Sequence, residues 1–156
     1  MGSSTDANIR ILVDTNIALT YVSGREDRYS ASSEQVMRLC AEEKVMGFLA
    51  FHSLSIIWYV TRKIPENKRR EWLRQLCEML IVIGATQDEV LAAIDRDEFS
   101  DFEDCLQDKC AKTAGCDYIV TANIKDYDQS EIKAVSPDDF IKLALYTVNG
   151  GIIAST

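Results

Sequence analysis

The chain has 156 residues, of which 47% are hydrophobic and 27% charged, a composition typical of one soluble globular domain. No apolar run reaches the ~18 residues that a membrane span needs, and the polar segment 1–8 lacks the order of a signal peptide. We therefore expect a cytoplasmic protein that does not bind membranes. The formal net charge of −8 argues against nucleic-acid binding by the overall field. Contact with nucleic acid would need a local basic patch or metal ions.

Two residue types narrow the chemistry further. The five cysteines are odd in number and form no C-x-x-C pair, which favours reduced thiols over disulfides or a zinc site. His52 is the only histidine, which argues against any mechanism that needs a histidine pair. We interpret His52, near a helix start, and Trp58, on an apolar stripe, as structural residues.

Short apolar runs alternate with segments of helical periodicity along the chain. Strands are predicted at 9–13, 47–51, 81–83, 118–121 and 134–135. Helices are predicted at 14–22, from 32, at 53–62, 65–80, from 86, at 101–114 and at 137–145. Capping boxes are predicted at Ser32/Gln35, Thr86/Glu89 and Ser100/Glu103, and Gly115 and Pro137 mark a helix end and a helix start.

This alternation predicts an α/β protein, a three-layer α/β/α sandwich with a central, mostly parallel sheet of four to five strands. We expect residues 1–8 to be disordered or vector-derived, residues 9–146 to form a single domain, and the tail at 147–156 to fray.

Asp14 comes directly after the first predicted strand, in the sequence IRILVDTN. In open α/β sheets, ligands bind beyond the carboxyl ends of the strands, which makes Asp14 a candidate functional residue. A helix N-cap is the alternative interpretation, since Asp, Thr and Asn all serve that role.

Further acids are predicted at the same edge of the sheet. Helical geometry places Asp101, Asp104 and Asp108 within roughly 60° on one face, with the apolar stripe of Phe102, Leu106 and Cys110 on another. A solvated helix start is the alternative, because the helix dipole favours acids there. If the first and fourth strands are neighbours, these carboxylates crowd Asp14, together with Asn123 and Asp126 after the fourth strand. A divalent cation would relieve the repulsion, and ligands that are all oxygen suit Mg²⁺ or Mn²⁺.

Four motifs in this order, ILVDTN, SDFEDCLQ, DYIVTANIKDY and SPDDFI, strongly resemble the PIN domain family. The likeness is to the bacterial branch that reads D-x-N, then D-F-E-D-A-L-Q, then T-x-N-x-x-D-[FY], and it covers residues 9–143. The resemblance implies a three-layer fold and Mg²⁺- or Mn²⁺-dependent cleavage of phosphodiester bonds, usually in RNA, without a protein nucleophile. Many members are toxins of the VapC type held inactive by an antitoxin protein, and many are homodimers.

The resemblance also implies roles for individual residues. Asp14 and Asp104 would be the catalytic metal ligands, and Asp101 and Asp126 would be supporting metal ligands or acids just outside them. Asn16 and Thr121 would steady the site by hydrogen bonds. Asn123 stands where many PIN domains place another acid.

One departure from the family pattern weakens this expectation. The helix after the second strand usually carries a glutamate or an asparagine near its start, and here that position is Ile56. Because Asn123 is also neutral, the acidic quartet is incomplete, a departure that concerns catalysis rather than the fold.

A basic patch follows Ile56 in the sequence. Its six residues are Arg62, Lys63, Lys68, Arg69, Arg70 and Arg74. One interpretation is a solvated helix face. The other is an RNA-binding strip that positions the phosphate backbone beside the acids.

Three functions remain open from the sequence alone. The first is a metal-dependent ribonuclease, either by itself or as the toxin of a toxin-antitoxin pair, and the second is a degenerate PIN domain that binds RNA or a protein partner without cleavage. The third is a phosphotransfer protein, for which Asn16 stands where a haloacid-dehalogenase-type phosphatase needs an aspartate, and Gly84 and Ala85 stand where a response-regulator receiver needs one.

Overall fold

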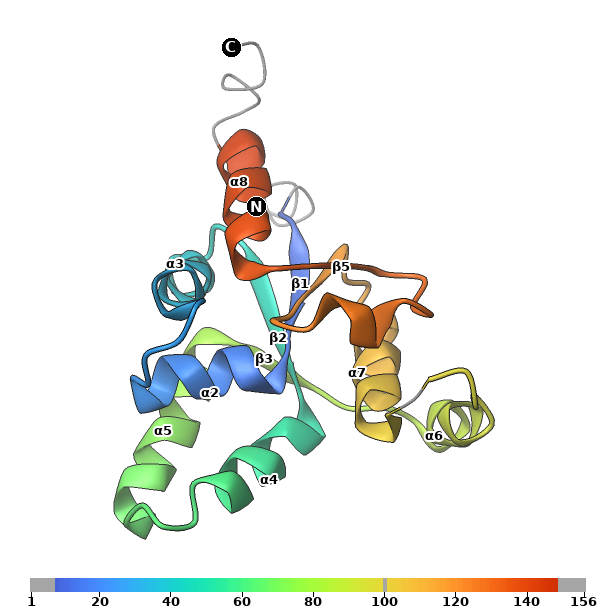
Figure 1. Cartoon of the computed structure of the whole chain (residues 1–156), viewed down its shortest axis with the longest axis horizontal. Helices are drawn as coiled ribbons and strands as arrows, with labels where there is room; N and C mark the ends of the chain where they lie inside the picture. The colour runs from blue at the N-terminus through green and yellow to red at the C-terminus, as the bar shows by residue number, and fades with distance from the viewer. Residues whose placement is uncertain (1–7, 100, 149–156) are drawn as a thin grey trace.

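The computed structural model describes residues 8–99 and 101–148 and contains one parallel sheet (Figure 1). The strand order is β3-β2-β1-β4-β5. The strands are β1 (Arg10–Val13), β2 (Met46–Ala50), β3 (Ile81–Ile83), β4 (Tyr118–Val120) and β5 (Lys133–Val135). Every pair is parallel, and β1 lies between β2 and β4, with Leu12 opposite Phe48 and Ile119. The predicted neighbourhood of the first and fourth strands is therefore confirmed.

Helices cover both faces of this sheet. They are α2 (Thr15–Ser23), α3 (Ser30–Ala41), α4 (Phe51–Val60), α5 (Glu66–Met79), α6 (Gln87–Ile94), α7 (Phe102–Thr113) and α8 (Pro137–Val148), with a 3₁₀ turn η1 (Ile124–Tyr127). One core packs Ile11 and Val13 against α2, α3, α5 and α8, and the second packs Leu12 against α6 and α7. Burial on both faces explains why Ile11–Val13 of β1 form a continuous apolar run rather than an alternating one. The predicted three-layer α/β sandwich is confirmed.

The ends of several elements differ from the prediction. Phe51 opens α4 and is 67% exposed, because the backbone leaves the sheet at Ala50. β4 ends at Val120, one residue early, and α8 continues to Val148 rather than ending at Leu145. Of the N-terminal segment 1–8 and the tail 147–156, which were predicted to be disordered or frayed, residues 1–7 and 149–156 lie outside the described residues.

The three predicted capping boxes have different outcomes. Thr86 caps α6 by accepting a hydrogen bond from the Glu89 backbone N–H. The box at Ser32 is wrong, because α3 begins at Ser30, and Ser32 is buried within that helix. Asp27 accepts a hydrogen bond from the backbone N–H of Tyr29 just before this start. Ser100 lies outside the described residues.

Gly47 marks a close approach of the layers. A Cβ atom there would lie 2.5 Å from Cys40 Sγ on α3 and 2.6 Å from a Leu80 methyl group after α5. Glycine therefore lets both helices pack directly on β2. Among the described residues, no helix is long and apolar enough to cross a membrane.

Candidate active site

A pocket of about 210 Å³ opens at the carboxyl ends of β1 and β4. Its lining comprises Asp14, Thr15, Asn16, Ile56, Asp101, Glu103, Asp104, Thr121, Ala122, Asn123 and Asp126. All seven predicted metal-site and supporting residues are in this lining. The fold brings them together because β1 and β4 are adjacent and parallel, so their ends meet at one edge of the sheet.

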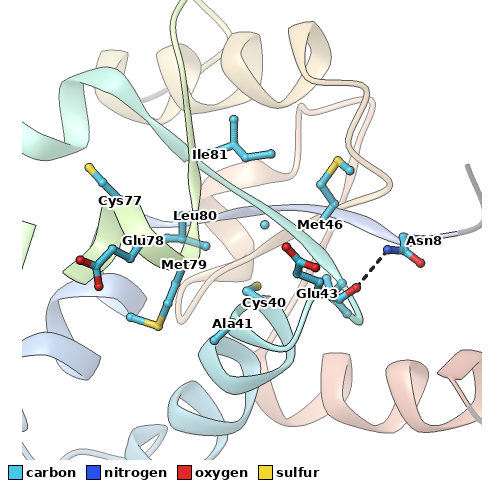
Figure 2. Close-up of a pocket in the computed structure, with 12 residues that line it drawn as sticks. Asn8, Cys40, Ala41, Glu43, Met46, Cys77, Glu78, Met79, Leu80 and Ile81 are labelled. Carbon is cyan, nitrogen blue, oxygen red and sulfur yellow. Dashed lines mark hydrogen bonds between the residues drawn. The ribbon is translucent and has the colours of Figure 1, made fainter. Parts of the chain in front are cut away.

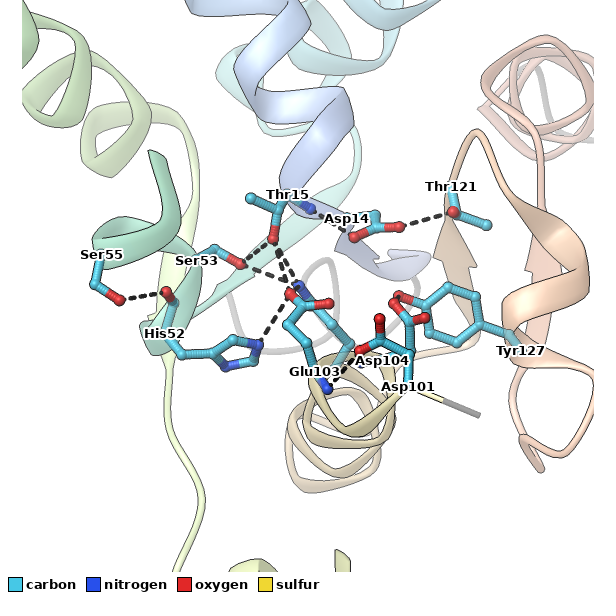
Figure 3. A network of polar contacts seen from close by, with 11 residues as sticks. Asp14, Thr15, His52, Ser53, Ser55, Asp101, Glu103, Asp104, Thr121 and Tyr127 are labelled. Carbon is cyan, nitrogen blue, oxygen red and sulfur yellow. Dashed lines mark hydrogen bonds and ion pairs between the residues drawn. The ribbon is translucent and has the colours of Figure 1, made fainter. Parts of the chain in front are cut away.

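Asp14 is the N-cap residue of α2, and it also lies in the lining of the pocket. One carboxylate oxygen accepts a hydrogen bond from the Thr15 backbone N–H at 2.7 Å, so Asp14 caps α2. The other accepts one from the Thr121 hydroxyl at 2.7 Å across the β1–β4 pair. The side chain is only 7% exposed, and both oxygens face the pocket side of the sheet, where the acids gather (Figure 3).

Asp101 and Asp104 reach the pocket from the start of α7. Asp101 is the N-cap residue, and its side chain accepts hydrogen bonds from the backbone N–H groups of Glu103 and Asp104. Asp104 is buried, and the Tyr127 hydroxyl donates to it at 3.4 Å. These contacts hold Asp101 at the mouth of the acidic pocket and Asp104 at its floor.

Burial shifts the pKa values of the two deepest acids. Burial raises the pKa of Asp14 to about 6, and the nearby Glu103 charge adds to this effect. Burial raises the pKa of Asp104 to about 8, with further increases from Glu103, Asp101 and Asp14. The same burial and the neighbouring acids raise the pKa of Tyr127, which keeps its hydroxyl protonated and able to donate. The pocket therefore concentrates more negative charge than it can hold without a counter-charge.

Glu103 is a site residue that the sequence reasoning treated only as part of a capping box. Its Oε1 accepts from Gln107 Nε2 at 2.9 Å and lies 3.2 Å from His52 Nε2 and 3.3 Å from Thr15 Oγ1 (Figure 3). Burial tends to raise the pKa of Glu103, but the His52 and Gln107 hydrogen bonds outweigh it and the pKa is lowered. The D-F-E-D motif contained this residue, but nothing local indicated its partners.

His52 thus contacts Glu103, one of the acids of the pocket lining, because α4 and α7 bring the two side chains together. Trp58 is half-buried and lies under the Arg69 guanidinium, 3.9 Å from the ring centroid.

Asp108 does not share the pocket with Asp101 and Asp104. It is fully buried, accepts a hydrogen bond from Arg96 at 3.0 Å and contacts the Ser130 hydroxyl. The prediction that all three acids gather was wrong for Asp108, because it lies one helical turn beyond Asp104 and is bound there by Arg96 and Ser130. Phe102, predicted on the apolar stripe, is the first residue of α7 and is 49% exposed.

The remaining pocket residues occupy its rim. Asn16 and Asn123 are exposed, Asp126 is half-buried, and Ile56 forms part of the wall. Thr121 accepts from the Asn123 backbone N–H as well as donating to Asp14. The structure thus places Ile56 at the pocket, so α4 presents an apolar side chain where the family pattern has an oxygen ligand.

The six basic residues do not line the acidic pocket. They lie on α5 and the turn before it, where Arg70 pairs with Glu66 and Lys68 with Glu71. Arg62 stacks on Tyr59, and Arg62 and Lys63 line a separate groove between α2 and the end of α4.

The pocket residues fit a divalent cation. Asp101, Glu103 and Asp104 each offer a carboxylate oxygen, and these atoms lie within 4.8 Å of one another. The described lining holds five carboxylates and no basic side chain. Oxygen-only donors of this kind suit Mg²⁺ or Mn²⁺ better than zinc or copper.

A larger hollow of about 490 Å³ lies at the opposite end of the sheet (Figure 2). Met46 and Ile81, the first residues of β2 and β3, are in its lining with Cys40, Cys77 and Leu80. This end of the strands is remote from the acidic pocket.

The fold and the site define an α/β protein with an acidic, metal-compatible pocket at the carboxyl edge of a parallel sheet. The chain belongs to the PIN domain family, because the model of that family matches residues 10–125.

Individual relatives agree with this assignment. The chain is 26% identical over 135 residues to Ribonuclease VapC1 of Aquifex aeolicus (strain VF5), a match that covers 84% of this chain and 92% of that protein. In VapBC2 from Rickettsia felis, solved bound to a DNA fragment from their promoter, a chain is similar with a TM-score of 0.64 and 16% identity, covering 82% of this chain and 98% of that one. VapC20 from Mycobacterium tuberculosis, a Sarcin-Ricin loop cleaving toxin, gives a TM-score of 0.52 and 20% identity over 70% of this chain and 86% of that one. These two structural likenesses show the fold.

Proposed function

We propose that this protein is a Mg²⁺- or Mn²⁺-dependent endoribonuclease of the PIN type. The observation that carries the proposal is the buried pair Asp14 and Asp104, whose pKa values are raised in a pocket lined by five carboxylates. Membership of the family and the ribonuclease name of the Aquifex relative support it.

Each pocket residue has a role in this proposal. Asp14 and Asp104 hold the metal, and Asp101 and Asp126 support it from the rim. When bound, the ion supplies Lewis-acid activation of water and stabilises charge on the attacked phosphate. Thr121 orients Asp14 through its 2.7 Å hydrogen bond, and Asn16 and Asn123 border the entrance to the site.

The biological setting is part of the same proposal. The Rickettsia relative is a VapBC complex, which supports an antitoxin protein as the partner of this chain. We place the protein in the cytoplasm as the toxin of a toxin-antitoxin pair, acting on RNA as a homodimer.

A second candidate is a degenerate PIN domain that binds RNA or a protein without cleavage. The observation that favours it is Ile56 on the pocket wall, together with the neutral Asn123 at the rim. Ile56 stands where a family member usually carries an oxygen ligand, and Asn123 stands where many members carry an acid.

Cleavage of RNA by matched variants separates the two candidates. Total RNA is incubated with the full chain in Mg²⁺, in Mn²⁺ or in EDTA. Asp14→Asn and Asp104→Asn should each reduce cleavage by about 100-fold or more, since each removes a charged metal ligand. Glu78→Gln, an exposed charge at the opposite end of the sheet, is the control and should cleave as the wild type does. Cleavage that persists in EDTA, or in both aspartate variants, would contradict the proposal.

The basic residues are tested by the salt dependence of RNA binding. Arg62, Lys63 and Arg74 are exposed near α4 and α5, and we propose that they contact RNA phosphates. Arg62→Gln with Lys63→Gln should lower the slope of log affinity against log salt by about 1–2, because each phosphate contact releases counterions. Binding of a fluorescent single-stranded RNA in EDTA measures this slope. Lys142→Gln on α8, at the far end of the molecule in Figure 1, should leave it unchanged.

A further inference from the structure

Glu103 is held more firmly than the other acids of the pocket. Its Oε1 faces donors from three elements: Thr15 of α2, His52 of α4 and Gln107 of α7. A carboxylate oxygen of Glu103 also lies within 4.8 Å of oxygens from Asp101 and Asp104. The side chain is therefore fixed in direction and aimed at the other acids.

The Gln107 amide helps to hold the Glu103 carboxylate in this direction. Its Nε2 lies 2.8 Å from Thr15 Oγ1, 3.1 Å from Ser53 Oγ and 2.9 Å from Glu103 Oε1. The side chain is fully buried, and its Oε1 has no hydrogen-bond partner within the described parts of the chain. An unpartnered buried acceptor destabilises the folded chain. The amide is held in this orientation because it donates to Glu103, Thr15 and Ser53.

Helix α4 also contributes a side chain to this hydrogen-bond network. Ile56 brings no oxygen to the pocket wall, but His52, one turn earlier on α4, reaches Glu103 with its Nε2. The same helix therefore contributes to the acidic pocket through Glu103 rather than through a carboxylate of its own.

We propose that Glu103 is a metal ligand that compensates for Ile56, and that His52 and Gln107 are positioning residues that hold its carboxylate toward the metal. This inference rests on the proposed function, because it needs a divalent cation between the acids of α7 and Asp14.

Binding of Mn²⁺ to the full chain, measured by isothermal titration calorimetry, tests the inference without an activity assay. Glu103→Gln keeps the shape of the side chain and should weaken Mn²⁺ binding by about 10-fold or more. His52→Ala should weaken it by about 10-fold, whereas His52→Gln, whose amide nitrogen replaces Nε2, should stay within about 3-fold of the wild type. The control Glu78→Gln removes the same charge far from the pocket and should change binding less than about 2-fold.

The outcomes distinguish this inference from the function on which it rests. Wild-type Mn²⁺ affinity in Glu103→Gln, with binding lost in Asp104→Asn, would overturn the role of Glu103 and leave the proposed function standing. Equal weakening by His52→Ala and His52→Gln would overturn the positioning role of His52. No Mn²⁺ binding by the wild type would overturn both. Thermal unfolding of each variant in EDTA checks that the chain is folded.

Discussion

Asp104 and Asp14 respond differently to neutral pH when no cation is bound. With a pKa of about 8, Asp104 is largely protonated at pH 7, whereas Asp14, at about 6, is mostly ionised. At neutral pH the crowded pocket thus holds one mostly protonated and one mostly ionised acid, as expected for closely spaced carboxylates. Metal binding must displace the proton from Asp104, so the affinity for cations should rise with pH.

The raised pKa of Asp104 should also make the stability of the protein in EDTA depend on pH. An aspartate of the unfolded chain has a pKa near 4, so above pH 4 the unfolded chain releases a proton that folded Asp104 keeps until about pH 8. The free energy of unfolding should therefore fall as pH rises from 5 to 8, by on the order of 2 kcal/mol from this residue.

Urea unfolding at several pH values measures this effect. Asp104→Asn resembles the protonated acid and should flatten the profile, so that the variant is more stable than the wild type at pH 8 in EDTA. A wild-type profile as flat as that of the variant would contradict the raised pKa. Saturating Mn²⁺ should reverse the order at pH 8, because only the wild type gains the full ligand set.

The residues differ in how far the sequence could predict them. The apolar run before Asp14 placed this residue at the end of a strand. Asp104 and Asp126 were identified from the later motifs SDFEDCLQ and DYIVTANIKDY, which contain them. The contact of His52 with Glu103 had no local signal, because it depends on how α4 and α7 pack.

At the scale of elements, a buried ion pair fastens two loops beside the site. Arg96, between α6 and α7, donates to Asp108 of α7 at 3.0 Å and to the Gln129 backbone oxygen at 2.8 Å. Asp108 also contacts Ser130, whose hydroxyl accepts from the Ile132 backbone N–H. The loops tied in this way flank Asp101 and Asp126.

Removal of one partner should therefore be costly. Arg96→Ala leaves the fully buried Asp108 carboxylate without its cation and should lower the free energy of unfolding by about 3 kcal/mol. Arg38→Ala breaks an exposed pair with Glu34 on α3 and should cost less than about 0.5 kcal/mol. Chemical unfolding of both variants compares them directly, and equal losses would refute the importance of the buried pair.

Element types were predicted better than element ends. The alternation of apolar runs and helical periods predicted all five strands in their chain order. The central strands β1 and β2 are mostly buried, and burial on both sheet faces requires such apolar runs. The start of α3 was missed, since the turn before it is closed by side-chain contacts of Asp27 and Ser30, and this pair lacks the Glu or Gln of the usual capping box.

At the scale of the whole molecule, the two ends of the chain depend on each other. Phe140 and Ala144 of α8 and Val135 of β5 belong to the same buried core as Ile11 and Val13 of β1. A chain that ends at Asn123 keeps most of the pocket residues but lacks β5 and α8.

We expect this shortened chain to lose cooperative unfolding, because its main core is left open. Thermal unfolding followed by circular dichroism measures this, with a chain that ends at Val148 as the control that keeps every described element. A sharp transition in the chain that ends at Asn123 would show that the last strand and helix are dispensable.

The pairing of β1 with β4 also has a consequence for the time at which the pocket is formed during synthesis. Asp14 and Thr121, which share a hydrogen bond, are separated by 107 residues. At ordinary translation speeds, ~5–20 s pass between the synthesis of the two. For most of that interval the chain on the ribosome lacks both the acids at the start of α7 and strand β4, so Asp14 has neither beside it. The order of synthesis thus keeps the site unassembled until most of the protein has been made.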